Sequence, residues 1–243
     1  MENYDVFIFG TGTAGKLVAK RCAAAGLKTA IIDNREYGGT CSQRGCDPKK
    51  LMMASSEAFE FANNMQGDGI TGTFSVDFKA ARNFAGRYTQ NIPDNTEQAL
   101  KDAGVSCYHG SAQFIDAHTI VLEDEEISAK HFVIATGLKP MELNIPGAAH
   151  MLTSDDFFKL NELPEKAVFI GAGYVGMEFS HMLARAGCKV TIIDMGDRIL
   201  TPFEEFTGEL VYEQSLKLGI TFIMNAQAAS VEENEGRFTL HYG

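Results

Sequence analysis

The stretch that decides the fold is residues 4–33, YDVFIFGTGTAGKLVAKRCAAAGLKTAIID. Residues 4–9 have the pattern of a buried strand, and the glycine-rich Gly10–Gly15 follows directly. A helical pattern then runs to about Gly26, and a second strand ends at Asp33. A G-x-G-x-x-G loop between a strand and a helix, followed about 20 residues later by an acidic residue, is typical of a dinucleotide-binding unit.

The same pattern occurs again at residues 167–194, AVFIGAGYVGMEFSHMLARAGCKVTIID. The second copy lies 161 residues after the first, and Asp33 and Asp194 each follow the last glycine of their loop by 18 residues. Two matching copies are a far more specific signal than one. They predict an α/β fold with two Rossmann-like dinucleotide-binding domains, the first over residues 1–150 and the second, incomplete, over residues 151–243.

The residue types of the loop follow from what a dinucleotide needs. The first glycine permits a tight turn, the second lets the backbone approach the pyrophosphate, and the third packs the helix against the strand. The helix N-terminus offers N–H groups to the phosphates, and the acidic residue accepts hydrogen bonds from a ribose. The first copy thus predicts binding by Gly10, Gly12, Thr13, Ala14, Gly15 and Asp33, and the second by Gly171, Gly173, Tyr174, Val175, Gly176 and Asp194.

The segment between the copies contains further regular structure. Helices are expected from Pro48 to about Gln66 and from Val76 to Ala103. A short strand is expected at Val105–Tyr108, a β-meander over residues 112–130, and a further strand at His131–Ala135. Residues 138–165 contain Pro140, Pro146 and Pro164 and are expected to connect the domains.

The cysteines carry the chemical signal. Of the five, Cys22, Cys107 and Cys188 are scattered, whereas Cys41 and Cys46 share the stretch GGTCSQRGCDPKK at residues 38–50. A sparse, odd-numbered set is not a structural disulfide framework, and no second pair at ligand spacing suggests a metal site. A cysteine pair just after the second strand of a dinucleotide-binding unit indicates a redox-active disulfide beside a cofactor.

Charge and hydropathy exclude other classes of partner. The net charge of -11 argues against nucleic acid or an anionic membrane. No apolar run approaches the roughly 20 residues of a membrane span, and the N-terminus has no signal-peptide pattern. A cytoplasmic location without nucleic-acid or membrane partners is therefore expected.

Together these motifs resemble the pyridine nucleotide–disulfide oxidoreductases that carry the disulfide in the flavin domain, such as glutathione reductase, dihydrolipoamide dehydrogenase and mercuric reductase. The resemblance rests on Gly10–Gly15, on the cysteine segment Gly39–Lys50, on the A-T-G motif at residues 135–137, and on Gly171–Glu178. It implies FAD in the first domain and a nicotinamide dinucleotide in the second. The residues that it adds to the cofactor sites are Gly39, Thr40, Lys50, Ala112, Thr136, Gly137 and Glu178.

The resemblance also implies an order of events and a role for each group. A hydride passes from NAD(P)H through the flavin to the Cys41–Cys46 disulfide, and the electrons continue to a small-molecule disulfide. Cys46 would be the thiolate beside the flavin and Cys41 the exposed thiol that attacks the substrate. A lysine after the second cysteine, Lys50 rather than Lys49, would pair with Glu178, and Tyr174 would cover the nicotinamide pocket.

Two acidic residues depart from the pattern of the family. Asp33 replaces the glutamate that is usual at the ribose position, and its shorter side chain can still accept the bond. Asp47 replaces the valine or isoleucine that usually follows the second cysteine, and its carboxylate should raise the pKa of Cys46. Asp194 would repel a 2′-phosphate, so NADH is expected to be preferred over NADPH. The segment Pro48–Lys50 and Lys20 resemble glutathione reductases, whereas the acidic residue at the ribose site resembles dihydrolipoamide dehydrogenases. The substrate disulfide is therefore left open between these two types.

The resemblance covers only the N-terminal part of such enzymes. The C-terminal dimerisation domain and its histidine–glutamate acid–base pair are not found in the sequence, and the full-length protein is expected to be a homodimer. A thioredoxin-reductase type is excluded, because it needs C-x-x-C in the second domain. The alternative to a disulfide reductase is a cofactor-binding flavoprotein fragment or a diaphorase that transfers electrons without disulfide turnover.

Overall fold

The computed structural model describes residues 2–243 and divides into two compact units. The first comprises the residues up to Lys49 together with Ala85–Lys139, and the second comprises Lys50–Phe84 with Pro140–Gly243. This division differs from the expected consecutive domains, because residues 50–84 group with the second unit. An ion pair between Glu60 and Arg185 and an edge-on contact between Phe78 and Phe157 are among the contacts that hold them there.

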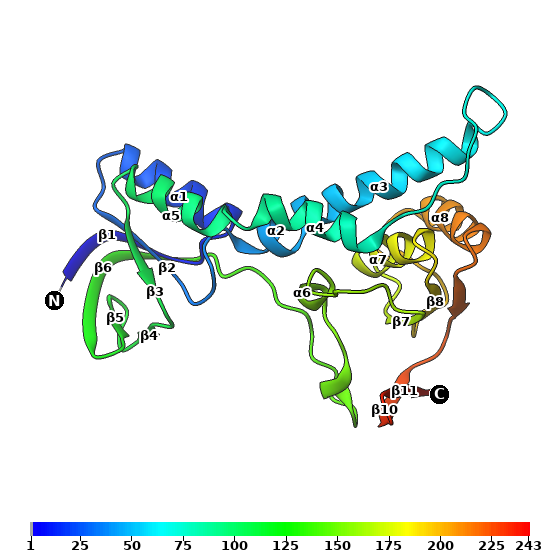
Figure 1. Ribbon diagram of the computed structural model, residues 1–243. Coiled ribbons are helices and arrows are strands. Elements are labelled where there is room, and N and C mark those ends of the chain that lie inside the picture. Colours follow the sequence, from blue (N-terminus) through cyan, green and yellow to red (C-terminus); the bar gives the residue numbers. More distant parts are fainter. Residues whose placement is uncertain (1) are drawn as a thin grey trace. The chain divides into compact units, whose positions relative to one another are not determined.

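The first unit is built on a six-stranded sheet (Figure 1). Four strands run parallel in the order β3-β2-β1-β6, and β5 and β4 continue the sheet antiparallel. The bounds are β1 Glu2–Phe9, β2 Thr29–Asp33, β3 Ser106–His109, β4 Gln113–Phe114, β5 Thr119–Leu122 and β6 Glu125–Ile134. The strand expected at residues 131–135 is thus the end of the longer β6.

Apolar residues cover both faces of this sheet. Helices α1 (Thr13–Ala24) and α5 (Ile92–Lys101) lie side by side on one face, where Ala19 and Leu100 pack against Ile8 and Ile31 (Figure 1). On the other face, Phe7 and its neighbours pack with β5 and β6. Removing these apolar side chains from water stabilises the sheet by about 25 cal/mol for each Å² buried. The packed strands hold in place the loops that begin at their ends.

Two helical segments differ from the sequence expectation. Residues 76–103 form two helices, α4 (Phe78–Thr89) and α5, because Pro93 in the first turn of α5 has no N–H to continue the hydrogen-bond ladder. The helix expected from Pro48 is α3 (Cys46–Asn64), and it begins at Cys46. A separate short helix, α2 (Gly39–Arg44), carries Cys41.

The second unit repeats the strand–loop–helix pattern on a smaller sheet. Its three parallel strands, in the order β7-β8-β9, are Lys166–Ile170, Lys189–Ile193 and Thr221–Ile223. Helix α7 (Tyr174–Arg185) follows β7, and α8 (Glu205–Lys217) precedes β9. The remaining elements are η1 (Ala148–His150), α6 (Ser154–Phe157) and the hairpin β10–β11, Ala228–Asn234 and Arg237–Tyr242. The predicted α/β fold with two Rossmann-like units is confirmed.

No helix among residues 2–243 combines the length and the apolar character that crossing a membrane requires.

Candidate active site

The first glycine loop is packed so closely that side chains would not fit. Gly10 has φ +102°, and a Cβ there would lie 2.3 Å from the carbonyl oxygen of Ala135. A Cβ on Gly15 would lie 1.8 Å from the oxygen of Gly10, and one on Gly39 would lie 2.4 Å from Cα of Gly12. The loop is therefore in backbone contact with two other predicted motifs, the A-T-G segment and the start of the cysteine segment.

Asp33 holds this loop from the end of β2. Its Oδ2 accepts hydrogen bonds from the backbone N–H of Thr11 (2.7 Å) and from Thr11 Oγ1 (2.6 Å), and its Oδ1 accepts one from the N–H of Arg35 (3.1 Å). Thr11 Oγ1 in turn accepts a bond from the N–H of Gly38 (3.2 Å). The fully buried Thr11 thus links the glycine loop to the cysteine segment. Thr11 was not among the residues predicted from the sequence. The available signal was its hydroxyl, since the second copy has Ala172 at the matching position.

A groove of about 360 Å³ opens beyond the end of β2. Its lining includes Asp33, Arg35, Tyr37, Glu97 and His109. The groove starts at the acidic residue that is expected to hold a ribose, next to the N-terminus of α1. A dinucleotide with its pyrophosphate on that helix end would have space here for its adenosine.

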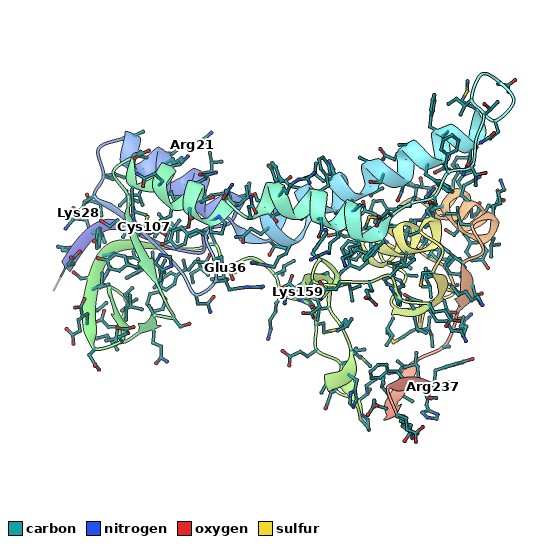
Figure 2. All side chains as sticks on the ribbon, viewed as in Figure 1. Arg21, Lys28, Glu36, Cys107, Lys159 and Arg237 are labelled. Atoms are coloured by element: carbon teal, nitrogen blue, oxygen red, sulfur yellow. The ribbon has the colours of Figure 1, made fainter. Side chains whose placement is uncertain are left out.

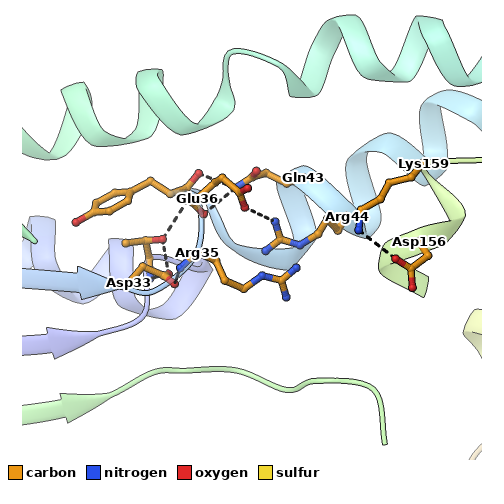
Figure 3. Close-up of polar contacts among 10 residues, drawn as sticks. Asp33, Arg35, Glu36, Gln43, Arg44, Asp156 and Lys159 are labelled. Carbon is orange, nitrogen blue, oxygen red and sulfur yellow. Dashed lines mark hydrogen bonds and ion pairs between the residues drawn. The ribbon is translucent and has the colours of Figure 1, made fainter. Parts of the chain in front are cut away.

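Two of the four residues between the two cysteines, Gln43 and Arg44, are bonded to the loop after β2 (Figure 3). Gln43 Nε2 donates to the carbonyl oxygens of Glu36 (3.0 Å) and Tyr37 (2.7 Å), and Arg44 NH1 bonds to Glu36 Oε2 (3.2 Å). Tyr37 is buried, and its hydroxyl donates to the carbonyl oxygen of Tyr108 at 2.7 Å. These bonds hold α2 against the first sheet, and Gln43 and Arg44 are further residues that sequence reasoning did not identify.

Cys41 and Cys46 lie together at the junction of α2 and α3. Both are free thiols, and their side chains are hydrogen-bonded to each other. The pKa of Cys41 is raised, first by this hydrogen bond, then by burial and by the charges of Cys46 and Asp47. Cys46, the first residue of α3, is exposed, whereas Cys41 on α2 is only partly exposed. The expectation that Cys41 is the exposed thiol of the pair is therefore wrong for this structure, because α2 and α3 meet over it. Asp47 is thus one of the groups that oppose ionisation of Cys41, and its expected effect on Cys46 stays a prediction.

The second glycine loop has the same backbone design. Gly171 also has φ +102°, and its N–H donates to the carbonyl oxygen of Ile193 at 2.8 Å. A Cβ on Gly176 would lie 2.7 Å from the oxygen of Gly171, so this approach is looser than its counterpart in the first loop. Tyr174 is the first residue of α7 and is exposed, as is Val175 beside it.

Asp194 closes the second loop as Asp33 closes the first. Its Oδ2 accepts from the N–H of Ala172 (2.6 Å), and its Oδ1 accepts from the N–H of Gly196 (2.7 Å). Met195 beside it is exposed. The guanidinium of Arg198 donates to the carbonyl oxygens of Thr201 (2.8 Å) and Phe203 (3.3 Å), so it is engaged by its own loop.

The other predicted residues have these positions. Thr13 and Ala14 form the exposed start of α1, and Thr40 lies in the first turn of α2. Thr136 and Gly137 come after β6 and Ala135, and Cα of Thr136 lies close to Gly10. The side chain of Ala112 packs into the core of the first sheet. Lys50 is exposed on α3, and Glu178 is partly buried on α7, both within the second unit. The pairing of Lys50 with Glu178 stays a prediction.

Comparison with known proteins gives a consistent result. The family model described as pyridine nucleotide-disulphide oxidoreductase matches residues 4–242. The chain is 31% identical over 242 residues to dihydrolipoyl dehydrogenase 2 of Haloarcula marismortui, covering 95% of this chain and 51% of that protein. It is 32% identical over 232 residues to glutathione reductase of Nostoc sp., covering 95% and 50%. The chain thus spans about half the length of the curated relatives that it matches.

The fold has a similar match among solved structures. The HOCl-induced flavoprotein disulfide reductase RclA from Escherichia coli aligns with a TM-score of 0.85 at 27% identity, covering 98% of this chain and 53% of that one. Dihydrolipoyl dehydrogenase and glutathione reductase are matched at nearly equal identity, so similarity alone does not select a substrate.

Proposed function

Because the chain belongs to the pyridine nucleotide-disulphide oxidoreductase family, we propose that it is the cofactor-binding and disulfide-bearing part of an NADH-dependent flavoprotein disulfide reductase. The observation that carries the proposal is the placement of Cys41 and Cys46. They are hydrogen-bonded to each other on a segment whose first glycine, Gly39, touches the glycine loop at Gly12. A redox-active disulfide here would lie beside whatever dinucleotide that loop binds.

The first unit fits FAD by its own geometry. Glycines at three close contacts, Gly10, Gly15 and Gly39, let the backbone segments pack closely around the start of α1, where phosphates would meet backbone N–H groups. We propose that Asp33 at the end of β2 would also accept ribose hydroxyls, and that the adenine would enter the groove of about 360 Å³ beyond it. When bound, FAD would supply the two-electron chemistry that links a nicotinamide to the disulfide. The protein residues would hold and orient it.

The proposed reaction uses the cysteines as an electron store. Two electrons and a proton from NADH, with one proton from solvent, convert the Cys41–Cys46 disulfide into two thiols and leave NAD⁺. The reduced pair then passes the electrons to a small-molecule disulfide by thiol–disulfide exchange. Lys50 and Glu178 are proposed as a charged pair beside the flavin, and Tyr174 as the cover of the nicotinamide pocket. We further propose that the longer protein is a cytoplasmic homodimer.

An anaerobic titration tests the proposal. The chain is loaded with FAD, reduced with NADH, and its free thiols are counted with a chromogenic disulfide. We expect NADH to release two additional thiols, located at Cys41 and Cys46 by mass spectrometry, and Cys41→Ser as the matched control to abolish that release. Flavin bleaching by NADH without thiol release would contradict the proposal and favour a diaphorase.

The NADH preference has its own test. The carboxylate of Asp194 is held by two backbone N–H groups, and the guanidinium of Arg198 is bonded to its own loop. We propose that the negative charge of Asp194 would repel a 2′-phosphate. We expect the chain to bind NADH more tightly than NADPH. Asp194→Asn should reduce the ratio of the two affinities about tenfold, which corresponds to about 1.4 kcal/mol. Asp197→Asn is the charge-matched control. Tighter binding of NADPH by the unaltered chain would overturn the preference.

A further inference from the structure

Lys16 occupies a position that is unfavourable for a cation. It is the fourth residue of α1, close to the positive end of the helix dipole, and its side chain is half-buried. Burial and the charge of Lys20 one turn further along lower the pKa of its ammonium. A residue that departs from the local rules of stability often has a role in function.

The backbone brings Lys16 to the cysteine segment. The N–H of Lys16 bonds to the carbonyl oxygen of Gly12 at 3.0 Å, and Gly12 is in contact with Gly39. From this contact α1 leads to Lys16 and α2 leads to Cys41. The ammonium of Lys16 reaches back to the carbonyl oxygen of Gly38 at 3.3 Å, at the start of α2.

The charges around this point favour a pairing with Cys41. The ammonium of Lys16 interacts favourably with the thiolate of Cys41 and the carboxylate of Asp47, and unfavourably with Lys20. The thiolate form of Cys41 is disfavoured by the hydrogen bond with Cys46, by burial, and by the charges of Cys46 and Asp47. The charge of Lys16 acts in the opposite direction on this anion, from its position at the start of α2.

We propose that Lys16 is a positioning residue for the thiol–disulfide exchange, because its ammonium stabilises the thiolate of Cys41 against the carboxylate of Asp47. This inference rests on the function proposed above. In the exchange step, the Cys41 thiolate attacks one sulfur of the substrate disulfide, so that a Cys41–sulfur bond forms and the substrate bond breaks. The second half of the substrate leaves as a thiolate and takes up a proton. Lys16 acts on the attacking group of this step, the thiolate of Cys41.

Site-resolved alkylation tests the inference without flavin or nicotinamide. The full 243-residue chain is reduced chemically, and the rate at which iodoacetamide modifies Cys41 is followed from pH 6 to 10 by peptide mass spectrometry. Lys16→Gln should slow the modification at pH 8 by about threefold to tenfold, as a rise in pKa of half a unit to one unit would. Lys16→Arg should retain most of the rate, and Asp47→Asn should increase it.

Two controls separate this effect from loss of charge or of structure. Lys20→Gln removes the same charge from an exposed position of α1 and should change the rate less than twofold. The rate at Cys107, which is partly buried on β3 (Figure 2), should be the same in all variants if the fold is intact. Equal effects of Lys16→Gln and Lys20→Gln on Cys41 would overturn the inference. Because no NADH is used, this result is independent of the NADH-driven thiol release.

Discussion

The two glycine loops can be matched residue by residue, since each feature of the first recurs 161 positions later. Gly10 and Gly171 have the same φ of +102°, and α1 and α7 have 12 residues each. Asp33 and Asp194 accept hydrogen bonds from the corresponding N–H groups of Thr11 and Ala172. The backbone of the unit is thus specified twice, by the same residue types.

The surroundings of the two loops differ. In the first unit the hydroxyl of Thr11 bonds to the N–H of Gly38, and the segment that follows carries Cys41 and Cys46. In the second unit Ala172 has no hydroxyl, and its carbonyl oxygen accepts a bond from the N–H of Leu200 instead, at 3.0 Å. The loop of the first unit is therefore bonded to the segment that carries the cysteine pair, whereas the loop of the second unit is bonded to Leu200 at the corresponding residue.

The largest expected effect concerns how tightly each loop packs on its helix. A Cβ added to Gly15 would lie 1.8 Å from the carbonyl oxygen of Gly10. A Cβ added to Gly176 would lie 2.7 Å from the carbonyl oxygen of Gly171. Gly15→Ala should therefore destabilise the chain by about 3 kcal/mol and Gly176→Ala by about 1 kcal/mol, the two ends of the usual range for overpacking. Urea unfolding followed by circular dichroism measures the difference.

Gly12→Ala is the matched control for this pair. Its φ is -68°, and a Cβ there would have only Cα of Gly39 within reach, at 4.0 Å. We expect little change in the urea midpoint. Equal losses for Gly15→Ala and Gly176→Ala would mean that the two loops are packed alike, and the comparison would fail.

A second, smaller effect tests the link between loop and cysteine segment. Thr11→Ala makes the first loop like the second and removes the hydroxyl that joins Asp33 to the N–H of Gly38. Because Thr11 and Gly38 are buried, the loss should be about 1 to 2 kcal/mol. Thr11→Ser should restore most of the stability. A neutral Thr11→Ala, measured by urea unfolding, would show that the hydroxyl does not hold the two segments together.

The smallest expected effect is a dependence on pH that belongs to the second unit. Lys20 of α1 is exposed, whereas its counterpart His181 of α7 lies among buried side chains. Ser215 Oγ donates to the carbonyl oxygen of Val211, so the Nε2–H of His181 donates to Ser215 Oγ at 2.7 Å. Nδ1 is then left to accept from Arg185 at 3.1 Å, an arrangement that requires a neutral ring.

Burial and then the charge of Arg185 lower the pKa of His181 in the folded chain. The unfolded chain therefore binds more protons between the folded pKa and the ordinary value of about 6.5. The contribution of neutral His181 to the free energy of unfolding should be fully present above about pH 6.5. It should decrease as the pH falls toward the pKa of His181 in the folded chain. His181→Gln should flatten this dependence in urea unfolding between pH 5 and 8. A slope that survives the substitution would assign it to other groups.

Much of the fold could be predicted because its signals are local. Runs such as Val6–Phe9 and Val190–Ile193 are largely buried strands, and the glycines at fixed spacing mark the loops, in which a Cβ at Gly10 or Gly15 would collide with the backbone. The β-meander and the cysteine segment were also evident from residue patterns. The break between α4 and α5 was missed, although Pro93 was its signal, because a continuous helical pattern on both sides hid it.

The candidate site was predictable only in part. The glycines and Asp33 were found because their chemistry is fixed by spacing along the chain. Thr11, Lys16, Gln43 and Arg44 were missed because each acts on a residue more than five positions away or through a backbone atom. Such contacts depend on how α1, α2 and the loop after β2 meet, and no local pattern reports that.

The sequence by itself determined that there are two dinucleotide-binding units and that one of them carries a cysteine pair, because turns, strands and helices depend on near neighbours. Only the tertiary structure decided that residues 50–84 group with the second unit, and that Gly39 lies against Gly12 so that Lys16 reaches the start of α2. Those relations come from packing between distant segments, where the shape of the buried surface rather than the identity of single residues selects the partner.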